Sequence, residues 1–436
     1  MRAHPGTYDV VILGAGYAGL MAGLRLSAWH CPLKALLISE FGAFTERVRL
    51  QEALASPVEP RLPPFGRWLA HTKLDFLQGR VTALHPSEGM VILETEQGEV
   101  AVLFDRCIYA LGSATRIDDV PGAAGHAFHL DPGEGPCAAA ALRARLQDAP
   151  NAARAVIVGG GNTAVEAAAQ IKASRPDFSV TMVAAHSVGD FAKGDEVRRA
   201  VRGQLEDQGI LLVDDDPVRE VGAGHVLTAS GRDIATDICV WAGGLQSPSI
   251  ATTAGIGVDE SNRIWVDGGL RSVSHPRILA VGDAVRPLAP TGAAYRPSAF
   301  AALTSGAYAA RSLLREARGR KYRPFSFSAF GQGVAIGSGG VGFATFPDDD
   351  EAYFIFTGPL ALRLRNFFVR ALVWFLRIER WWPGLAFFWI GRRRVAWSEA
   401  DAALTSGAAA SHSPPDGPKA ADPRPRRKAW ANAQTK

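Results

Sequence analysis

The chain has 436 residues, 47% hydrophobic and 21% charged, so it is long enough for two or three folded domains. Its formal net charge of +4 is unevenly placed, because residues 358–397 carry eight arginines against one acid, Glu379. Its four cysteines lie far apart, which excludes a CxxC redox pair and argues against a disulfide framework. No uncharged apolar run reaches the roughly 20 residues needed to span a bilayer. We therefore expect a protein of a reducing, cytoplasmic setting, without a signal peptide.

The N-terminal segment predicts a strand, a glycine turn, a helix and a second strand. Residues 8–13 are apolar and β-branched, residues 17–28 have small side chains on one face, and residues 33–39 are again apolar. This βαβ order is typical of dinucleotide-binding folds.

The turn between the first strand and the helix reads GAGYAG. Gly14 permits a tight bend, Gly16 lets the backbone approach a pyrophosphate, and Gly19 lets the helix pack closely on the sheet. Glu40 lies 21 residues past Gly19, where a carboxylate can bind ribose hydroxyls. The pattern favours a nucleotide site over a tight turn followed by a surface acid.

The next part of the chain predicts a Pro-rich loop at 57–64 and several strands over 74–110. Ala110 and Gly112 follow the last of these strands. Residues 118–136, rich in Gly, Pro and Asp, are expected to form a connection.

The opening pattern then returns about 145 residues later. A strand at 155–158 leads into a second fingerprint with Gly159, Gly161 and Ala164, where Ala in the third position still permits close helix packing. A helix over 163–172 and a strand over 179–184 complete the unit.

The second copy lacks the ribose acid, because Ala184 and Ala185 stand where the first copy has Glu40. An NAD site normally has a carboxylate there, and an NADP site has cations for the 2′-phosphate. His186, Lys193, Arg198 and Arg199 follow closely. Three interpretations stay open: a preference for NADPH, weaker binding of NADH, or a site no longer used.

The last third predicts a strand at 277–281 that ends at Asp283 and Ala284, directly followed by a helix to about residue 314. Short strands are expected over 325–356. Residues 398–436 are rich in Ala, Ser, Pro and charged residues and are expected to be disordered.

Residues 358–380 predict an amphipathic helix. Its expected apolar face is flanked by arginines, and five of the ten tryptophans lie between residues 374 and 397. This composition favours a helix on a membrane surface over the alternatives of a core helix or a homodimer interface. The members of the apolar face are Leu360, Leu364, Phe367, Phe368, Ala371, Leu372, Phe375 and Ile378, and those of the flanks are Arg363, Arg370, Arg377 and Arg380.

These motifs, in this order, resemble the two-dinucleotide-binding-domain flavoproteins, and among them the type II NADH dehydrogenase-like group. The resemblance implies an α/β fold of two Rossmann-type domains, the NAD(P) domain inserted in the FAD domain, followed by C-terminal strands and an amphipathic helix. It implies an FAD domain at 1–120 and 245–316, an NAD(P) domain at 121–244, and a membrane or interface region at 317–397.

The resemblance also implies residue roles. Asp283, followed by Ala284, is expected to hydrogen-bond the ribityl chain of FAD, with a helix N-cap as an alternative or additional role. Gln51 and Glu52 are expected to lie against the flavin ring, with the start of a helix as the alternative, and Ala110 and Gly112 are expected to contact the cofactor. Glu166, on the helix after the second fingerprint, is expected to face the junction of nicotinamide and flavin and to serve hydride or proton transfer, with a surface helix acid as the alternative.

The resemblance is incomplete at the acceptor side. The stretch 295–305 holds none of the glutamines that quinone reductases of the group carry there, and the chain lacks the paired cysteines of sulfide:quinone reductases. We expect an FAD-dependent NAD(P)H dehydrogenase that is peripheral on the inner membrane face and reduces a quinone-like acceptor, with no metal and no nucleic-acid partner. The alternatives are a soluble reductase with a protein acceptor and a flavin-binding regulatory protein with a decayed nicotinamide site.

Overall fold

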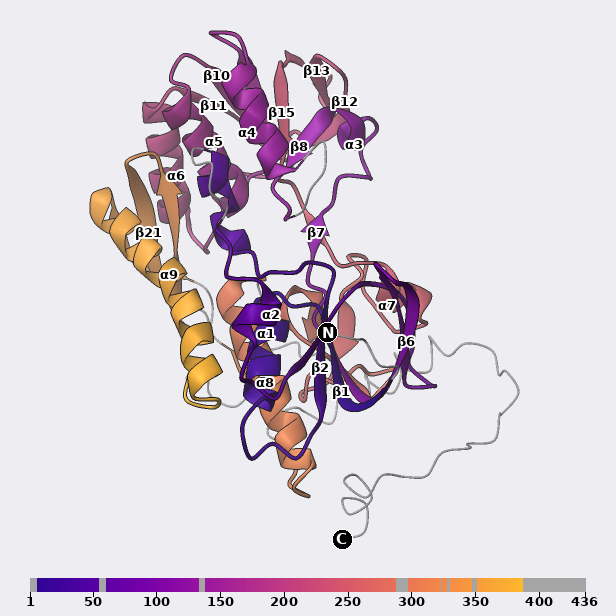
Figure 1. The fold of residues 1–436 in the computed structure, drawn as a ribbon. Coiled ribbons are helices and arrows are strands. Elements are labelled where there is room, and N and C mark those ends of the chain that lie inside the picture. The colour runs from indigo at the N-terminus through magenta and orange to yellow at the C-terminus, as the bar shows by residue number, and fades with distance from the viewer. Residues whose placement is uncertain are drawn as a thin grey trace.

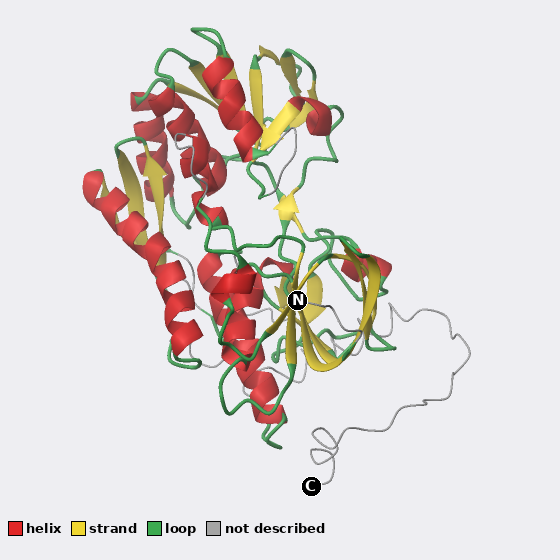
Figure 2. Ribbon diagram, in the orientation of Figure 1, coloured by secondary structure: helices red, strands yellow, loops and turns green. Residues whose placement is uncertain are grey.

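The computed structural model describes residues 6–54, 60–132, 138–287, 297–322, 324–327, 330–346 and 351–386. These residues form two α/β units, which lie one above the other in Figure 1, with helix α9 along one side of both. Figure 2 shows that helices cover the sheets of each unit. The predicted disordered tail, Cys137, Trp389 and Trp397 lie outside the described residues.

The lower unit in Figure 1 is built on a seven-stranded sheet with the strand order β3-β2-β1-β6-β5-β4, and β18 also pairs with β6. Strands β4 and β5 are antiparallel additions to an otherwise parallel sheet. The strands are β1 (Thr7–Leu13), β2 (Ala35–Ser39), β3 (Asp75–Gln78), β4 (Arg80–His85), β5 (Met90–Thr95), β6 (Gly98–Tyr109) and β18 (Ile278–Ala280).

Helices α1 (Tyr17–Leu26) and α8 (Ala299–Glu316) pack against each other in this unit. Every residue of α1 is buried. The two helices approach closely because Gly306 lies against the backbone of Ala18, and a Cβ at Gly306 would overlap the Ala18 carbonyl. Smaller elements complete the unit: α2 (Phe65–Trp68), α7 (Ile250–Thr253), β17 (Ile264–Val266), η2 (Gly282–Ala284) and β19 (Val285–Pro287). The short helix η1 (Arg47–Leu54) follows β2 in the chain but packs on α4 (Ala139–Asp148) and α5 (Asn162–Ser174) of the other unit.

The upper unit holds a five-stranded parallel sheet with the order β11-β10-β9-β15-β8. Its strands are nearly continuous apolar runs, as expected for a parallel sheet with both faces covered. The strands are β8 (Ala127–His129), β9 (Arg154–Val158), β10 (Ser179–Val183), β11 (Ile210–Val213) and β15 (Ile238–Trp241), and the helices are α3 (Ala123–His126), α4 (Ala139–Asp148), α5 (Asn162–Ser174) and α6 (Asp195–Asp207). A small antiparallel sheet contains β12 (Val218–Val221), β13 (His225–Thr228) and β14 (Asp233–Ala235).

The chain crosses between the units at β7 (Ala114–Thr115) and β16 (Leu245–Gln246), which pair with each other. The fold class predicted from the sequence is therefore confirmed: two Rossmann-type units, the second inserted in the first. The residue boundaries of the domains stay a prediction.

After α8 the chain forms the antiparallel strands β20 (Gly331–Ile336), β21 (Gly339–Thr345) and β22 (Ala352–Thr357), and then the long helix α9 (Pro359–Trp381). Helix α9 packs on β20 and β21 near its start and on α1 further along. None of the described helices is both long and apolar enough to cross a membrane.

Helix α9 is tied to α1 by a buried ion pair. Arg25 Nε lies 2.7 Å from Glu379 Oε1, and the two side chains are 7% and 0% exposed. The Glu379 carboxylate also accepts backbone N–H bonds from Gly384 and Ala386, at 2.7 and 3.2 Å. Because several donors surround the carboxylate, this buried charge is satisfied.

Two details differ from the sequence-based expectation. The long helix does not follow Asp283 directly: η2 and β19 come first, and α8 begins only at Ala299. The segment 118–136 is more than a connection, because β8 within it pairs with β15 at the edge of the second sheet.

Candidate functional site

The first glycine turn has the geometry that a pyrophosphate site needs. Gly14 has a φ of 95°, and a Cβ there would overlap the carbonyl oxygen of Ala110. A Cβ at Gly19 would overlap the Gly14 carbonyl, which explains why the third position is glycine. Gly16, by contrast, has open space where a Cβ would be, so the backbone is accessible to a ligand.

Two side chains beside this turn point to a bound group. Glu40 follows β2, is exposed and lines the same cavity as Gly14 and Gly16. The hydroxyl of Tyr17 is buried without a hydrogen-bond partner among the described residues. Burial raises the pKa of Tyr17, so the group stays a phenol that can donate a hydrogen bond to a ligand.

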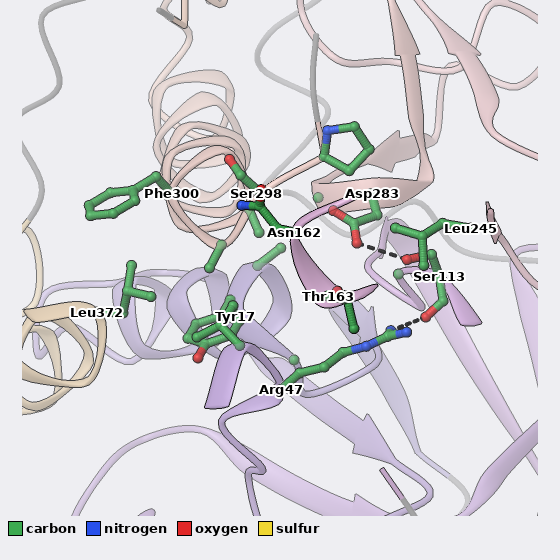
Figure 3. A pocket seen from close by; sticks show the side chains of 18 of the residues that line it. Tyr17, Arg47, Ser113, Asn162, Thr163, Leu245, Asp283, Ser298, Phe300 and Leu372 are labelled. Carbon is green, nitrogen blue, oxygen red and sulfur yellow. Dashed lines mark hydrogen bonds between the residues drawn. The ribbon is translucent and has the colours of Figure 1, made fainter. Parts of the chain in front are cut away.

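Asp283 lies on the other side of the first site, in the single turn η2, and not at the start of a long helix as predicted. It accepts a hydrogen bond of 2.8 Å from the hydroxyl of Ser113. Gly112, with a φ of 68°, turns the chain so that Ser113 faces Asp283. The next residue after Asp283, Ala284, is fully buried. Figure 3 shows this hydrogen bond between Asp283 and Ser113 at one side of the pocket.

The second glycine turn repeats the first. Gly159 has a φ of 131°, and a Cβ there would approach the Ala242 carbonyl oxygen to 2.7 Å. Gly161 has open space around it, and Ala164 is fully buried. The side-chain oxygen of Asn162 is buried without a partner among the described residues, so this turn too presents an unsatisfied polar atom.

Glu166 lies one turn further along α5 and is 7% exposed, so it is not the surface acid of the alternative interpretation. Its carboxylate receives two bonds from Arg365 on α9, at 2.9 and 2.6 Å, and one of 2.9 Å from the N–H of Ala335. Gln51 donates a further hydrogen bond to it. Arg365 also pairs with Glu52 at 3.1 Å. The predicted residues Gln51, Glu52 and Glu166 thus meet in one cluster, organised by Arg365 of a third segment, which was not predicted.

The protonation of Glu166 is set by opposing influences. Burial raises the pKa of its carboxyl group, whereas Arg365 and the Ala335 N–H act to lower it, and the net direction is upward. The carboxyl group therefore takes up a proton at a higher pH than an exposed glutamate does.

Both turns and the Glu166 cluster line one cavity of about 1860 Å³. A pocket for a single drug-sized ligand has a volume of roughly 300–1,000 Å³. The larger cavity of this protein therefore suits two dinucleotides that meet between the units. Among the described residues, the orphaned polar atoms and the two open glycine backbones fit FAD at the first turn and a nicotinamide nucleotide at the second.

The three cysteines in the described part of the chain take no part in this cavity. Cys31, Cys107 and Cys239 are free thiols, and none of the three lines the cavity. Burial raises the pKa of Cys107 and raises that of Cys239 to about 12, so both stay protonated and unreactive.

Fold and cavity together define an FAD-dependent NAD(P)H oxidoreductase. The sequence pattern described as pyridine nucleotide-disulphide oxidoreductase matches residues 8–302. The chain belongs to this family.

Curated relatives share the pattern at low identity. The chain is 24% identical to the demethylphylloquinone reductase NdbB of Synechocystis sp. over 347 residues, which cover 76% of this chain and 85% of that protein. It is 26% identical to human ferroptosis suppressor protein 1, covering 65% of this chain and 75% of that one.

A solved structure of NDH2 from Plasmodium falciparum in complex with NADH superposes with a TM-score of 0.68 and 14% identity, covering 88% of this chain and 100% of that one. At this identity the likeness shows the fold alone. It supports the type II NADH dehydrogenase-like assignment only together with the family match.

Sequence reasoning missed Arg365, Tyr17 and Asn162. Tyr17 and Asn162 occupy the same place in the two fingerprints, directly after Gly16 and Gly161, and that repetition was the available signal. Arg365 carries a weaker signal, because it falls at a helical spacing shared with buried positions of α9.

Proposed function

We propose that this chain oxidises NAD(P)H through its flavin and passes the electrons to a quinone-like acceptor that it takes from a membrane surface. The name of the Synechocystis relative, a demethylphylloquinone reductase, supports a quinone as the acceptor class. The missing glutamines of residues 295–305 do not argue against it, since in the described part of this stretch Ala299, Phe300 and Ala302 line the cavity with apolar side chains.

The observation that carries this proposal is the apolar arm of the cavity between α8 and α9. Phe300 of α8 and Phe368 of α9 meet edge to face, with ring centroids 6.5 Å apart. Leu364 and Leu372 of α9 line the same arm, and Figure 3 shows Phe300 and Leu372 at one side of the pocket. An apolar ring and its isoprenoid tail gain free energy by leaving water for such a wall.

The outer face of α9 carries an exposed apolar stripe. Leu360, Phe367, Trp374 and Trp381 recur every seven residues, and their exposed fractions are 58%, 65%, 62% and 65%. Residues at this spacing lie along one stripe of a helix. The predicted apolar face is therefore divided. Leu372 packs into the core, whereas Leu360 and Phe367 belong to the exposed stripe.

The arginines Arg363, Arg370 and Arg377, also seven residues apart, are exposed beside this stripe. Aromatic residues beside cations are the composition of a helix that lies in the headgroup region, and each arginine near an anionic surface contributes about 1 kcal/mol. We infer that α9 holds the protein as a peripheral protein on the inner, cytoplasmic membrane face.

The residues of this chain have separate tasks in the proposed reaction. The bound flavin would supply the redox chemistry, accepting hydride from the nicotinamide and passing electrons onward. The two glycine turns, with Glu40 and Asp283, hold the two nucleotides in register. Glu166 holds the proton that the acceptor needs, with Gln51 and Arg365 fixing its position.

An anaerobic experiment tests the electron path. The FAD-loaded protein is mixed with NADH or NADPH, the flavin absorbance is followed, and a short-chain quinone is then added. We expect bleaching by a nucleotide and reoxidation by the quinone. If neither nucleotide bleaches the flavin, the dehydrogenase proposal is wrong; bleaching without reoxidation points to a protein acceptor.

Vesicle flotation tests the membrane surface. Serine substitutions at Phe367, Trp374 and Trp381 should abolish flotation with vesicles of anionic phospholipid while leaving flavin content unchanged. Leu211→Ser is the matched control, because Leu211 is 63% exposed but lies on β11, away from α9. Equal flotation of the unmodified protein, the variant with the three serine substitutions and the Leu211→Ser control would contradict the proposal.

A further inference from the structure

The hydrogen bonds of the first βαβ unit fix where its ribose acid stands. The N–H of Gly14 donates to the carbonyl oxygen of Ile38 at 2.9 Å, which locks the turn to the end of β2. Glu40 follows two residues after Ile38 and is exposed.

The second unit has the same bond, so its positions can be matched one by one. The N–H of Gly159 donates to the carbonyl oxygen of Val183 at 2.8 Å. The residue two places after Val183 is Ala185, which is exposed. Ala185 therefore occupies the place of Glu40, and a methyl group stands where the first unit has its carboxylate.

One candidate to replace this acid, Asp214 at the end of the neighbouring strand β11, is already engaged. It accepts the N–H of Val188 at 2.8 Å and forms an ion pair with Arg202. Asp190, five residues past Ala185, lines the large cavity, as Gly160 and Gly161 do.

A cation lies beside the vacant position. Arg198, in the first turn of α6, has its Nη1 3.5 Å from the hydroxyl oxygen of Ser187, two residues past Ala185. Its other partner is Asp195, whose side chain is 67% exposed, so their ion pair is a surface pair of small net energy. An anion at Ser187 can therefore engage Arg198 at little cost.

We propose that the nucleotide half of this chain prefers NADPH, with the 2′-phosphate bound between Ser187 and Arg198. A carboxylate at position 185 would repel this phosphate, and alanine leaves room for it. The guanidinium offers paired donors that match a phosphate, and the Ser187 hydroxyl donates a third hydrogen bond. The inference rests on the proposed function, since it assigns the electron donor of the same site.

Calorimetric titration of the FAD-loaded full chain with 2′,5′-ADP and with 5′-AMP measures this subsite without any hydride transfer. We expect 2′,5′-ADP to bind at least about tenfold more tightly than 5′-AMP. Arg198→Ala should remove most of that difference and leave the binding of 5′-AMP unchanged. Arg199→Ala is the matched control, because Arg199 is the exposed neighbour and, within the described part of the chain, its side chain bonds the Asp195 carbonyl alone, at 3.4 Å.

A second variant tests the vacant position directly. Ala185→Glu should weaken the binding of 2′,5′-ADP by at least about tenfold and should raise the ratio of kcat/KM for NADH over NADPH. Unchanged flavin content shows that each variant is folded.

Two results overturn the inference: equal affinity of the unmodified protein for the two ligands, or an equal effect of Arg198→Ala and Arg199→Ala. Failure of the proposed function looks different. In that case 2′,5′-ADP binds tightly, but neither NADPH nor NADH bleaches the flavin.

Discussion

The βαβ unit that starts at Thr7 and the one that starts at Arg154 have the same backbone and different side chains. In both, the first glycine lies against a backbone carbonyl just past the neighbouring strand, β6 in the first unit and β15 in the second. The turn is also hydrogen-bonded to the end of the second strand of the unit. They differ at the third position of the fingerprint, Gly19 against Ala164, and at the end of the second strand, Glu40 against Ala185. The shared backbone thus provides for a pyrophosphate, while a few side chains decide which nucleotide follows.

The two units also differ in how they are tied to α9. The fingerprint helix of the first unit supplies a cation, Arg25, to Glu379. The fingerprint helix of the second supplies an anion, Glu166, to Arg365 at 2.6 Å. The polarity is reversed, and the two buried charges therefore respond differently when their partner is lost.

The largest expected effect follows from this reversal. Glu379→Ala should lower the free energy of unfolding by about 3–5 kcal/mol, because Arg25 cannot lose its proton and stays charged in the core. Arg365→Ala should cost less, since Glu166 can take up a proton instead. Urea denaturation at neutral pH measures both losses.

The Arg365→Ala loss should also depend on pH. Burial raises the pKa of Glu166 in the folded state, and Arg365 acts against this rise. The folded Arg365→Ala variant, which has lost that cation, therefore binds more protons above the ordinary pKa of glutamate than the folded unmodified protein does. The variant should therefore become less stable, relative to the unmodified protein, as pH rises from 5 to 8. Arg377→Ala, an exposed change on the same helix, should stay within about 0.5 kcal/mol at both pH values.

The third fingerprint position gives the next effect. Gly19→Ala should lower stability by about 3 kcal/mol and empty the flavin site, because the new methyl group overlaps the Gly14 backbone. The reverse exchange, Ala164→Gly, should cost only about 1 kcal/mol for the flexibility of glycine in a helix. Flavin absorbance and denaturation midpoints distinguish the two variants. If Ala164→Gly proves as damaging as Gly19→Ala, the two turns are not as alike as their backbones indicate.

The smallest expected effect concerns a surface ion pair that lies within the second unit alone. Arg154 at the start of β9 pairs with Asp237 before β15 at 2.9 Å, which lowers the pKa of Asp237 to about 2. This pair stabilises the fold above the ordinary pKa of aspartate, near 3.8, and the contribution is lost as pH falls towards 2.

Asp237→Asn should therefore lower stability slightly at neutral pH and flatten its decline between pH 4 and 2. The change is small because the Asp237 side chain is 31% exposed and water screens the pair. Acid titration followed by circular dichroism measures it. Asp118→Asn, at an exposed aspartate, should not alter the acid limb.

The parts of the fold that sequence could predict are those set by local pattern. The two glycine fingerprints predict the strand, the turn and the helix around them, because glycine is needed at fixed places in such turns. Glu166 and Gln51 were expected at the site and do line the cavity. Their functional roles stay a prediction.

What sequence could not predict depends on distant contacts. The ion pair of Glu166 with Arg365 joins residues 199 positions apart, and no local pattern connects them. The sequence predicts a helix start at Asp283 where the structure has a single turn, because a strand followed by Gly-Asp-Ala has the same local signal in either case. The edge strand β8 was missed since its three residues are stabilised by pairing with β15, far along the chain.

Helix α9 is pinned to the first unit through Glu379 and to the second through Arg365, at points 14 residues and thus about 21 Å apart along its axis. A hinge motion that separated the two units would have to break one of these buried pairs. Nucleotides therefore have to enter and leave through the mouth of the cavity while the units stay together. Truncation before α9 would leave two buried charges without partners, so a shortened chain would report on folding rather than on attachment.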